Sequence, residues 1–228
     1  MIGIIGAMKI EVETIRSMLE NKEEKQIGGV LFVKGLLRGS EVVTAECGIG
    51  KVAAAICTQT MIMEYAPDCI INTGVGGSLS DELDVCDAVV GEYLVQHDMD
   101  TTPLGDPPGL ISGLGIVKIP ADKEVCDKLK AAAEKAGINK VIKGIIASGD
   151  QFIAGKEKKD FIKNTFGAVC CEMEGASIAQ TCYSSGVPFA VLRTVSDNAD
   201  GSSHVTYSEF LPAAADLAAK TIMNFCEG

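Results

Sequence analysis

The chain has 228 residues, of which 47% are hydrophobic and 25 are glycine, so it is long enough to bury one large core. Its formal charge of −11 and its three arginines argue against nucleic acid or an anionic membrane as a partner. Nine cysteines without a Cys-x-x-Cys pair predict reduced thiols, and the lack of a signal-peptide pattern or a membrane-spanning apolar run predicts a cytoplasmic protein.

Apolar runs of strand length alternate with helical patterns along the chain, and no Pro- or Ser-rich linker divides it. We therefore expect one domain over residues 1–228. The predicted strands are 2–6, 30–37, 42–46, 69–73, 88–96, 141–147, 168–172 and 189–195. The predicted helices are 9–20, 50–65, 123–136, 156–165, 175–185 and 208–226, with a capping box of Thr206 and Glu209 before the last. This alternation predicts an α/β domain whose parallel or mixed sheet is covered on both faces.

The first predicted helix carries an acid beside its apolar face. Met8, Val12, Ile15 and Leu19 share one side of the helix, at about 100° per residue. Glu11 lies at the border of that side and at the mouth of the first strand. It is either a functional carboxylate that faces the interior or a first-turn acid that complements the helix dipole.

Two glycine-rich segments follow predicted strands. Residues 48–53 fit the dinucleotide pattern G-x-G-x-x-G/A, but no acid closes a second strand about 20 residues later, so a tight strand-to-helix turn explains them better. Residues 73–78 either let the backbone approach a flat ligand closely or simply bend the chain. Residues 98–115 contain several glycines and prolines without periodicity, and their length is typical of a functional or interface loop.

Two later strands also end in charged residues. Glu172 and Glu174 lie between a short apolar strand and a helix of small residues. A carboxylate there can accept both hydrogens of a vicinal diol or can serve as a helix N-terminal acid. Arg193, Ser196 and Asp197 follow an apolar strand, at the sheet edge where open α/β sheets bind ligands. Asp197 can hold a proton near neutral pH and donate it, or it can cap the next turn while Arg193 pairs with an acid at the rim.

The ordered set of these motifs is similar to one enzyme family. The motifs are residues 4–8 followed by Glu11, residues 48–54, 71–74 with Gly76 and Gly77, and residues 148–153, 172–174 and 195–197. Together they resemble the 5′-methylthioadenosine/S-adenosylhomocysteine nucleosidases of the purine nucleoside phosphorylase and uridine phosphorylase superfamily. The resemblance implies a three-layer α/β/α sandwich around a mixed, partly barrel-like central sheet, in a homodimer. It also implies irreversible hydrolysis of an adenine N-glycosidic bond without a metal or organic cofactor.

The resemblance further implies a role for each matched residue. Asp197 would protonate the leaving adenine at N7, Glu11 would activate water, and Arg193 would orient the carboxylates. The implied substrate-binding residues are Glu174 and Met173 at the ribose hydroxyls, Phe152, Ile153 and Gly77 at the adenine, and Met8, Ile49 and Tyr207 beside the ribose and the 5′ substituent. Glu172, Ser196 and Val75 belong to the same site, with Val75 where a small polar residue is frequent. The partner subunit's Thr101 would close the thioether pocket, where an apolar residue is expected.

Two alternatives compete with hydrolysis. Phosphorolysis needs a phosphate pocket, which the related phosphorylases build with arginines. Here only Arg193 falls in a matched motif, and Glu11 would repel an incoming anion by roughly 4 kcal/mol at ~4 Å and an effective dielectric of ~20. A non-catalytic nucleoside-binding protein is the second alternative. The three acids together with Arg193 argue against it.

Overall fold

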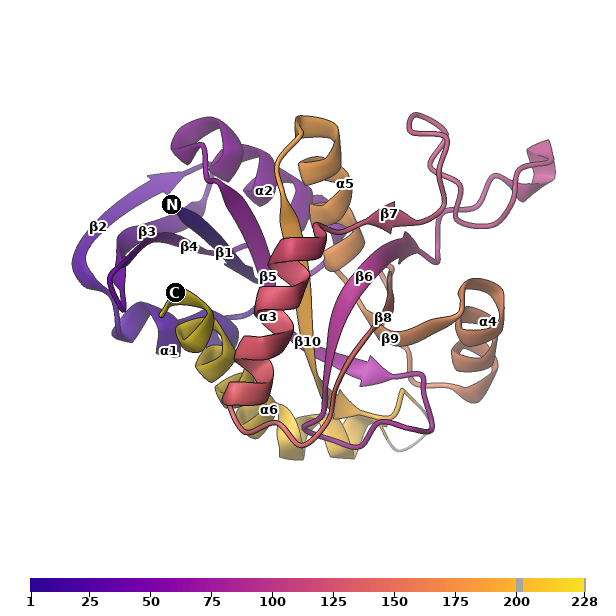
Figure 1. The fold of residues 1–228 in the computed structure, drawn as a ribbon. Helices are drawn as coiled ribbons and strands as arrows, with labels where there is room; N and C mark the ends of the chain where they lie inside the picture. Colours follow the sequence, from indigo (N-terminus) through magenta and orange to yellow (C-terminus); the bar gives the residue numbers. More distant parts are fainter. Residues whose placement is uncertain (200–202, 228) are drawn as a thin grey trace.

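Ten strands form one mixed sheet in the computed structural model, which describes residues 1–199 and 203–227. The strands are β1 (Ile2–Gly6), β2 (Glu20–Ile27), β3 (Val30–Leu37), β4 (Ser40–Glu46), β5 (Cys69–Ser78), β6 (Ala88–Gln96), β7 (Ile119–Pro120), β8 (Val141–Ser148), β9 (Ala168–Glu172) and β10 (Phe189–Asp197). The α-helices are α1 (Lys9–Ser17), α2 (Lys51–Tyr65), α3 (Lys123–Lys135), α4 (Lys156–Phe166), α5 (Gly175–Ser185) and α6 (Ser203–Cys226). A short 3₁₀ helix, η1 (Thr102–Leu104), lies in the long segment between β6 and β7 (Figure 1).

Part of this sheet closes on itself. The strand order is β10-β6-β8-β9-β5-β1-β4-β3-β2, and a further pairing of β10 with β5 makes a barrel of β5, β10, β6, β8 and β9. The strands β1, β4, β3 and β2 extend the sheet beyond the barrel, and their open edge is β2. Parallel and antiparallel pairs both occur, since β1 runs parallel to β4 and β5 while β10 runs antiparallel to β6. The predicted mixed, partly barrel-like sheet is confirmed.

Successive side chains of the strands point to opposite faces of the sheet and pack into two separate hydrophobic cores. In β1, Ile5 packs with α2 and α5, whereas Ile4 packs with α1, α3 and α6. In β10, Val191 and Leu192 divide between the same two cores. Successive side chains of a strand point to opposite faces, so fully apolar strands require helices on both sides. The helices α2 and α5 therefore form one outer layer and α1, α3 and α6 the other, while α4 packs beside β8 and β9.

The structure corrects several predicted boundaries. The first helix ends at Ser17 and not at residue 20, because the chain turns there into β2. No strand was predicted over β2, whose residues before Ile27 are polar and exposed, nor over the two-residue β7. The last helix begins at Ser203, so Thr206 lies within the helix and is not its N-cap. The side chain of Thr206 lies outside the described residues.

A long segment connects β6 to β7. The segment between β6 and β7 projects away from the rest of the domain, as Figure 1 shows. Within the described residues, no helix is both long enough and apolar enough to cross a membrane.

Candidate active site

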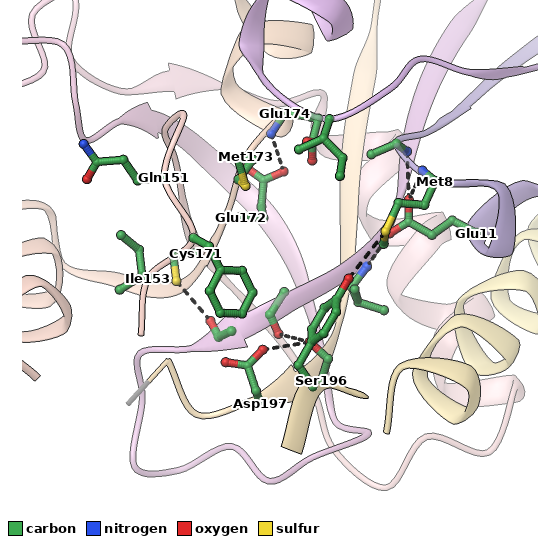
Figure 2. Close-up of a pocket in the computed structure, with 17 residues that line it drawn as sticks. Met8, Glu11, Gln151, Ile153, Cys171, Glu172, Met173, Glu174, Ser196 and Asp197 are labelled. Carbon is green, nitrogen blue, oxygen red and sulfur yellow. Dashed lines mark hydrogen bonds between the residues drawn. The ribbon is translucent and has the colours of Figure 1, made fainter. Parts of the chain in front are cut away.

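A cleft opens where β1, β5, β9 and β10 end, and together with the open space at its mouth it measures about 620 Å³ (Figure 2). The structure brings all but two of the predicted site residues to its wall: Met8, Glu11, Ile49, Val75, Gly77, Phe152, Ile153, Glu172, Met173, Glu174, Ser196, Asp197 and Tyr207. The two exceptions are Arg193, which lies behind the wall, and Thr101.

Glu11 faces the cleft from the first turn of α1. One carboxylate oxygen accepts hydrogen bonds from the backbone N–H groups of Ala7 (2.7 Å) and Met8 (2.9 Å), and the other accepts one from Val75 (3.1 Å). Glu11 therefore occupies both predicted positions, because it caps α1 and also lines the cleft. Burial raises the pKa of Glu11 above its ordinary value, against the opposing effects of the Arg193 charge and the three amides.

Glu172 is bonded to the protein at both of its carboxylate oxygens. One oxygen accepts a hydrogen bond from Ser148, and the other accepts bonds from Arg193 and from the N–H groups of Glu174 (3.1 Å) and Gly175 (2.7 Å). This carboxylate therefore caps the start of α5 and holds Arg193 in place. It lines the cleft with little acceptor capacity left for a ligand.

Glu174 has far fewer partners than Glu172. One of its carboxylate oxygens accepts a hydrogen bond from the Gly50 N–H (2.8 Å), and the other lies 3.8 Å from Arg193 Nη2. Burial, followed by the nearby charge of Glu172, raises the pKa of Glu174 to about 7. A carboxylate with free acceptor positions inside a cleft can hold two hydroxyl groups of one ligand.

Arg193 is buried beneath the acids. Its exposed fraction is 2%, and its guanidinium donates to Asn72 Oδ1 (2.6 Å), to the Leu192 carbonyl (2.9 Å) and to Glu172. The alternative interpretation, in which Arg193 pairs with an acid at the rim, is wrong in its location, because the guanidinium is buried and pairs with acids of the cleft wall. It acts on the cleft through Glu172 and its charge.

Asp197 ends β10 at the cleft. One of its oxygens accepts a hydrogen bond from Ser196 Oγ (2.9 Å) and the other from the Ala199 N–H (2.8 Å). The pairing of β10 with β5 shifts register between Val195 and Asp197, which lets the consecutive residues Ser196 and Asp197 both reach the cleft. Gly77 of β5 lies so close that a Cβ there would be 3.1 Å from the Asp197 carboxylate.

Apolar side chains cover the outer part of the cleft. The rings of Phe152 and Tyr207 meet edge to face with centroids 5.6 Å apart, and the Tyr207 hydroxyl donates to Met8 Sδ at 3.4 Å. Phe152 is 51% exposed and Ile49 is 61% exposed, so both can gain contacts with a ligand.

Some important residues carried no predicted role. Gln151 and Cys171 also line the cleft, and Asn72 and Ser148 hold Arg193 and Glu172. A single Asn within the buried strand β5 is itself a signal, since a buried amide needs a hydrogen-bond partner. Thr101 does not line the cleft of its own subunit, and its hydroxyl donates to Asp106 at 2.8 Å.

Comparison with known proteins gives consistent matches over almost the full length. The family model described as "Phosphorylase superfamily" matches residues 1–227. A 5′-methylthioadenosine/S-adenosylhomocysteine nucleosidase of Shewanella halifaxensis (strain HAW-EB4) is 41% identical over 223 residues, which cover 97% of this chain and 96% of the relative.

Two solved structures show the same fold. The crystal structure of the 5′-methylthioadenosine/S-adenosylhomocysteine nucleosidase from Neisseria meningitidis in complex with methylthio-immucillin-A superposes with a TM-score of 0.95 at 37% identity, covering 99% of this chain and 98% of that one. The native structure of futalosine hydrolase of Helicobacter pylori strain 26695 has a TM-score of 0.93 at 37% identity, covering 98% and 96%.

Proposed function

Because the chain belongs to the 5′-methylthioadenosine/S-adenosylhomocysteine nucleosidase family within the phosphorylase superfamily, we propose that it hydrolyses the N-glycosidic bond of 5′-substituted adenosines and releases adenine. One observation carries the proposal: Glu11, Glu174 and Asp197, which come from three separate strand ends, line a single cleft. The reaction needs one group to donate a proton and another to accept one, and these acids supply both.

Asp197 is the general acid of the proposed mechanism. Adenine is a poor leaving group as an anion, so a proton delivered to N7 stabilises the transition state more than the bound substrate. The hydrogen bonds from Ser196 and the Ala199 N–H fix the direction of the carboxyl group. Phe152 stacks on the base, and Ile153 and Gly77 offer backbone contacts to its edge.

Glu11 is the general base. The carboxylate removes a proton from water as the water attacks the anomeric carbon, and its raised pKa makes it a stronger base. The ribosyl group becomes positively charged in the transition state, and the carboxylates around it stabilise that charge. Glu174, beside Met173, accepts hydrogen bonds from the two ribose hydroxyls, while Met8, Ile49 and Tyr207 contact the 5′ substituent.

Phosphorolysis is the rival reaction. The described residues that line the cleft include no Lys or Arg, and the guanidinium of Arg193 is engaged behind them. A phosphate entering beside Glu11 would meet repulsion of roughly 4 kcal/mol at ~4 Å and an effective dielectric of ~20. The test measures adenine release from 5′-methylthioadenosine, S-adenosylhomocysteine, 5′-deoxyadenosine and aminofutalosine with and without phosphate. We expect phosphate-independent release, and a phosphate-dependent sugar 1-phosphate product would contradict the proposal.

We also propose a homodimer, on the support of two surfaces. Val52, Ile56 and Met63 form an exposed apolar stripe along α2, Ile49 lies just before the helix, and each of the four is more than half exposed. The projecting segment between β6 and β7 reaches away from its own domain and carries the 83%-exposed Leu104 (Figure 1). In the dimer this segment brings the partner subunit's Thr101 to the thioether side of the cleft.

The state of the cysteines supports a cytoplasmic location. All nine are free thiols, and eight of them are buried. Burial raises the pKa of Cys182 and of Cys57 to about 12, which keeps both thiols protonated and unreactive. Free thiols are typical of proteins in reducing compartments.

A further inference from the structure

The carboxylate of Glu174 is held by a backbone turn rather than by a side chain. Its Oε1 accepts the hydrogen bond from Gly50, the residue directly before α2. Gly50 has a φ of +99°, a conformation that other residues rarely adopt, and a Cβ there would be 2.9 Å from Asp150 Oδ1. The direction of the Gly50 N–H therefore depends on whatever holds this turn.

Lys51 holds the turn through three parts of its structure. Its backbone N–H donates to Asp150 Oδ1 (2.7 Å), and its carbonyl accepts from Ser177 Oγ of α5 (2.5 Å). Its ammonium group donates to Asp98 Oδ1 (2.6 Å) and to Gln96 Oε1 (3.1 Å) at the end of β6. One residue thus joins the start of α2 to β6, to α5 and to the loop after β8.

A hydrogen bond links the Lys51–Asp98 ion pair to the loop that lines the base end of the cleft. The second oxygen of Asp98 accepts from the Asp150 N–H (2.9 Å), and Asp150 precedes the cleft residues Gln151, Phe152 and Ile153. The Lys51 and Asp98 side chains are each 18% exposed, so solvent weakens their attraction less than at the open surface. Burial acts to raise the pKa of Asp98, but the hydrogen bonds from Lys51 and the Asp150 amide outweigh it and lower that pKa.

We propose that Lys51 is a positioning residue for the hydrolysis reaction. Through Asp98 and Asp150 it fixes the loop that contacts the base, and through the Gly50 turn it directs Glu174 toward the ribose. The base and the ribose of the substrate are thereby held in fixed positions relative to each other, although Lys51 itself does not line the cleft. The inference rests on the proposed function, because it assigns Lys51 to the binding of that substrate.

Lys51→Met is the first test, with steady-state kinetics on 5′-methylthioadenosine. The methionine keeps the length of the side chain and removes the donors to Asp98 and Gln96. We expect KM to rise about 10-fold, the factor that accompanies one weakened hydrogen bond to a charged group. We expect kcat to change by less than about threefold, because Lys51 acts on binding and not on the reacting atoms. Lys123→Met, at an 89%-exposed lysine on α3, is the matched control and should change neither constant.

A double-mutant cycle tests whether Lys51 acts through Glu174. Glu174→Gln removes the charged acceptor that the Gly50 turn directs. If Lys51 acts in part through that carboxylate, adding Lys51→Met to Glu174→Gln should lower kcat/KM by clearly less than Lys51→Met does alone, and the remaining loss is the part that acts through the base loop. Multiplication of the two single effects would overturn the part of the proposal that runs through Glu174.

Folding is checked separately by thermal unfolding of every variant. Should Lys51→Met fail to fold, Asp98→Asn carries the test, since it keeps the side-chain shape and weakens the same ion pair. We expect it to raise KM in the same direction. An unchanged KM in a folded Lys51→Met or Asp98→Asn variant would overturn the inference while wild-type adenine release still supports the proposed function. A wild-type protein that releases no adenine would overturn both.

Discussion

The carboxylates of Glu11, Glu172 and Glu174 share one cleft but differ in what each is bonded to. Glu11 accepts three backbone N–H groups, Glu172 is bonded to the protein at both oxygens, and Glu174 accepts one amide. Of the three, Glu174 keeps the most acceptor positions for a diol, and Glu11 combines three backbone hydrogen bonds with a raised pKa. In the proposed mechanism, one residue type thus serves as a base, a structural anchor and a ligand-binding group.

The first prediction concerns the two acids with proposed proton-transfer roles. Glu11→Gln and Asp197→Asn should each lower kcat/KM by about 10²–10⁴-fold, because the amides cannot transfer the proton. Both variants should still bind adenine, as measured by calorimetric titration. Glu13→Gln, at an exposed residue of α1, is the control and should keep full activity. Full turnover by either active-site variant would remove its assigned role.

A second prediction follows from the raised pKa of Glu174. The ligand-free protein holds a proton on Glu174 below about pH 7, whereas binding of the ribose hydroxyls requires the ionised form. Substrate-analogue binding below pH 7 should therefore release a proton, and affinity should increase as pH rises through about 7. Calorimetry at pH 6 in buffers of different ionisation enthalpy measures the release. Glu174→Gln should abolish it, and equal heats in all buffers for the wild type would contradict the prediction.

At the scale of secondary-structure elements, β5 forms the floor of the cleft because of its glycines. A Cβ on Gly74 would lie 2.4 Å from Glu11 Oε1, and one on Gly76 would lie 2.7 Å from Cys170 Sγ. The strand therefore lies closer to the side chains of Glu11 and Cys170 than any residue with a Cβ would allow. Residues 73–78 do not form a bend, because they continue β5, and two of their glycines make room for side chains of the protein.

Gly74→Ala tests that geometry. The new methyl group should displace the Glu11 carboxylate and lower kcat/KM by about 10²-fold. The free energy of unfolding should fall by about 1–3 kcal/mol, because the surroundings are closely packed. Gly113→Ala, at a site with open space around the glycine, is the control. Wild-type kinetics in a folded Gly74→Ala variant would show that Glu11 tolerates displacement.

The buried strands could be predicted from the sequence, whereas the exposed edge strand β2 and the position of Arg193 could not. Apolar runs identified the strands that helices cover, because burial on both faces leaves little choice of residue. The strand β2 escaped prediction because a polar, exposed edge strand has no apolar pattern. The cleft acids could be found from their places at strand ends. The buried position of the Arg193 side chain could not be found in this way, because it depends on hydrogen bonds to Asn72 and Glu172, which are distant in sequence.

At the scale of the whole molecule, the apolar stripe on α2 predicts a dimer that one charge can disrupt. Ile56→Glu would bury an unpaired carboxylate in the proposed interface and should weaken dimerisation by at least about 100-fold. Sedimentation velocity across a concentration series measures the change. Met18→Glu, at an equally exposed apolar residue of α1, should leave the dimer intact. A wild-type protein that sediments as a monomer would contradict the prediction.

The closure of the barrel has a consequence for how a ligand reaches the cleft. β5 is hydrogen-bonded to β1, β9 and β10, and all ten of its residues are buried. Its amides should therefore exchange with deuterium only when the entire domain opens. A nucleoside must therefore enter from the open side of the cleft, where Phe152 is 51% exposed.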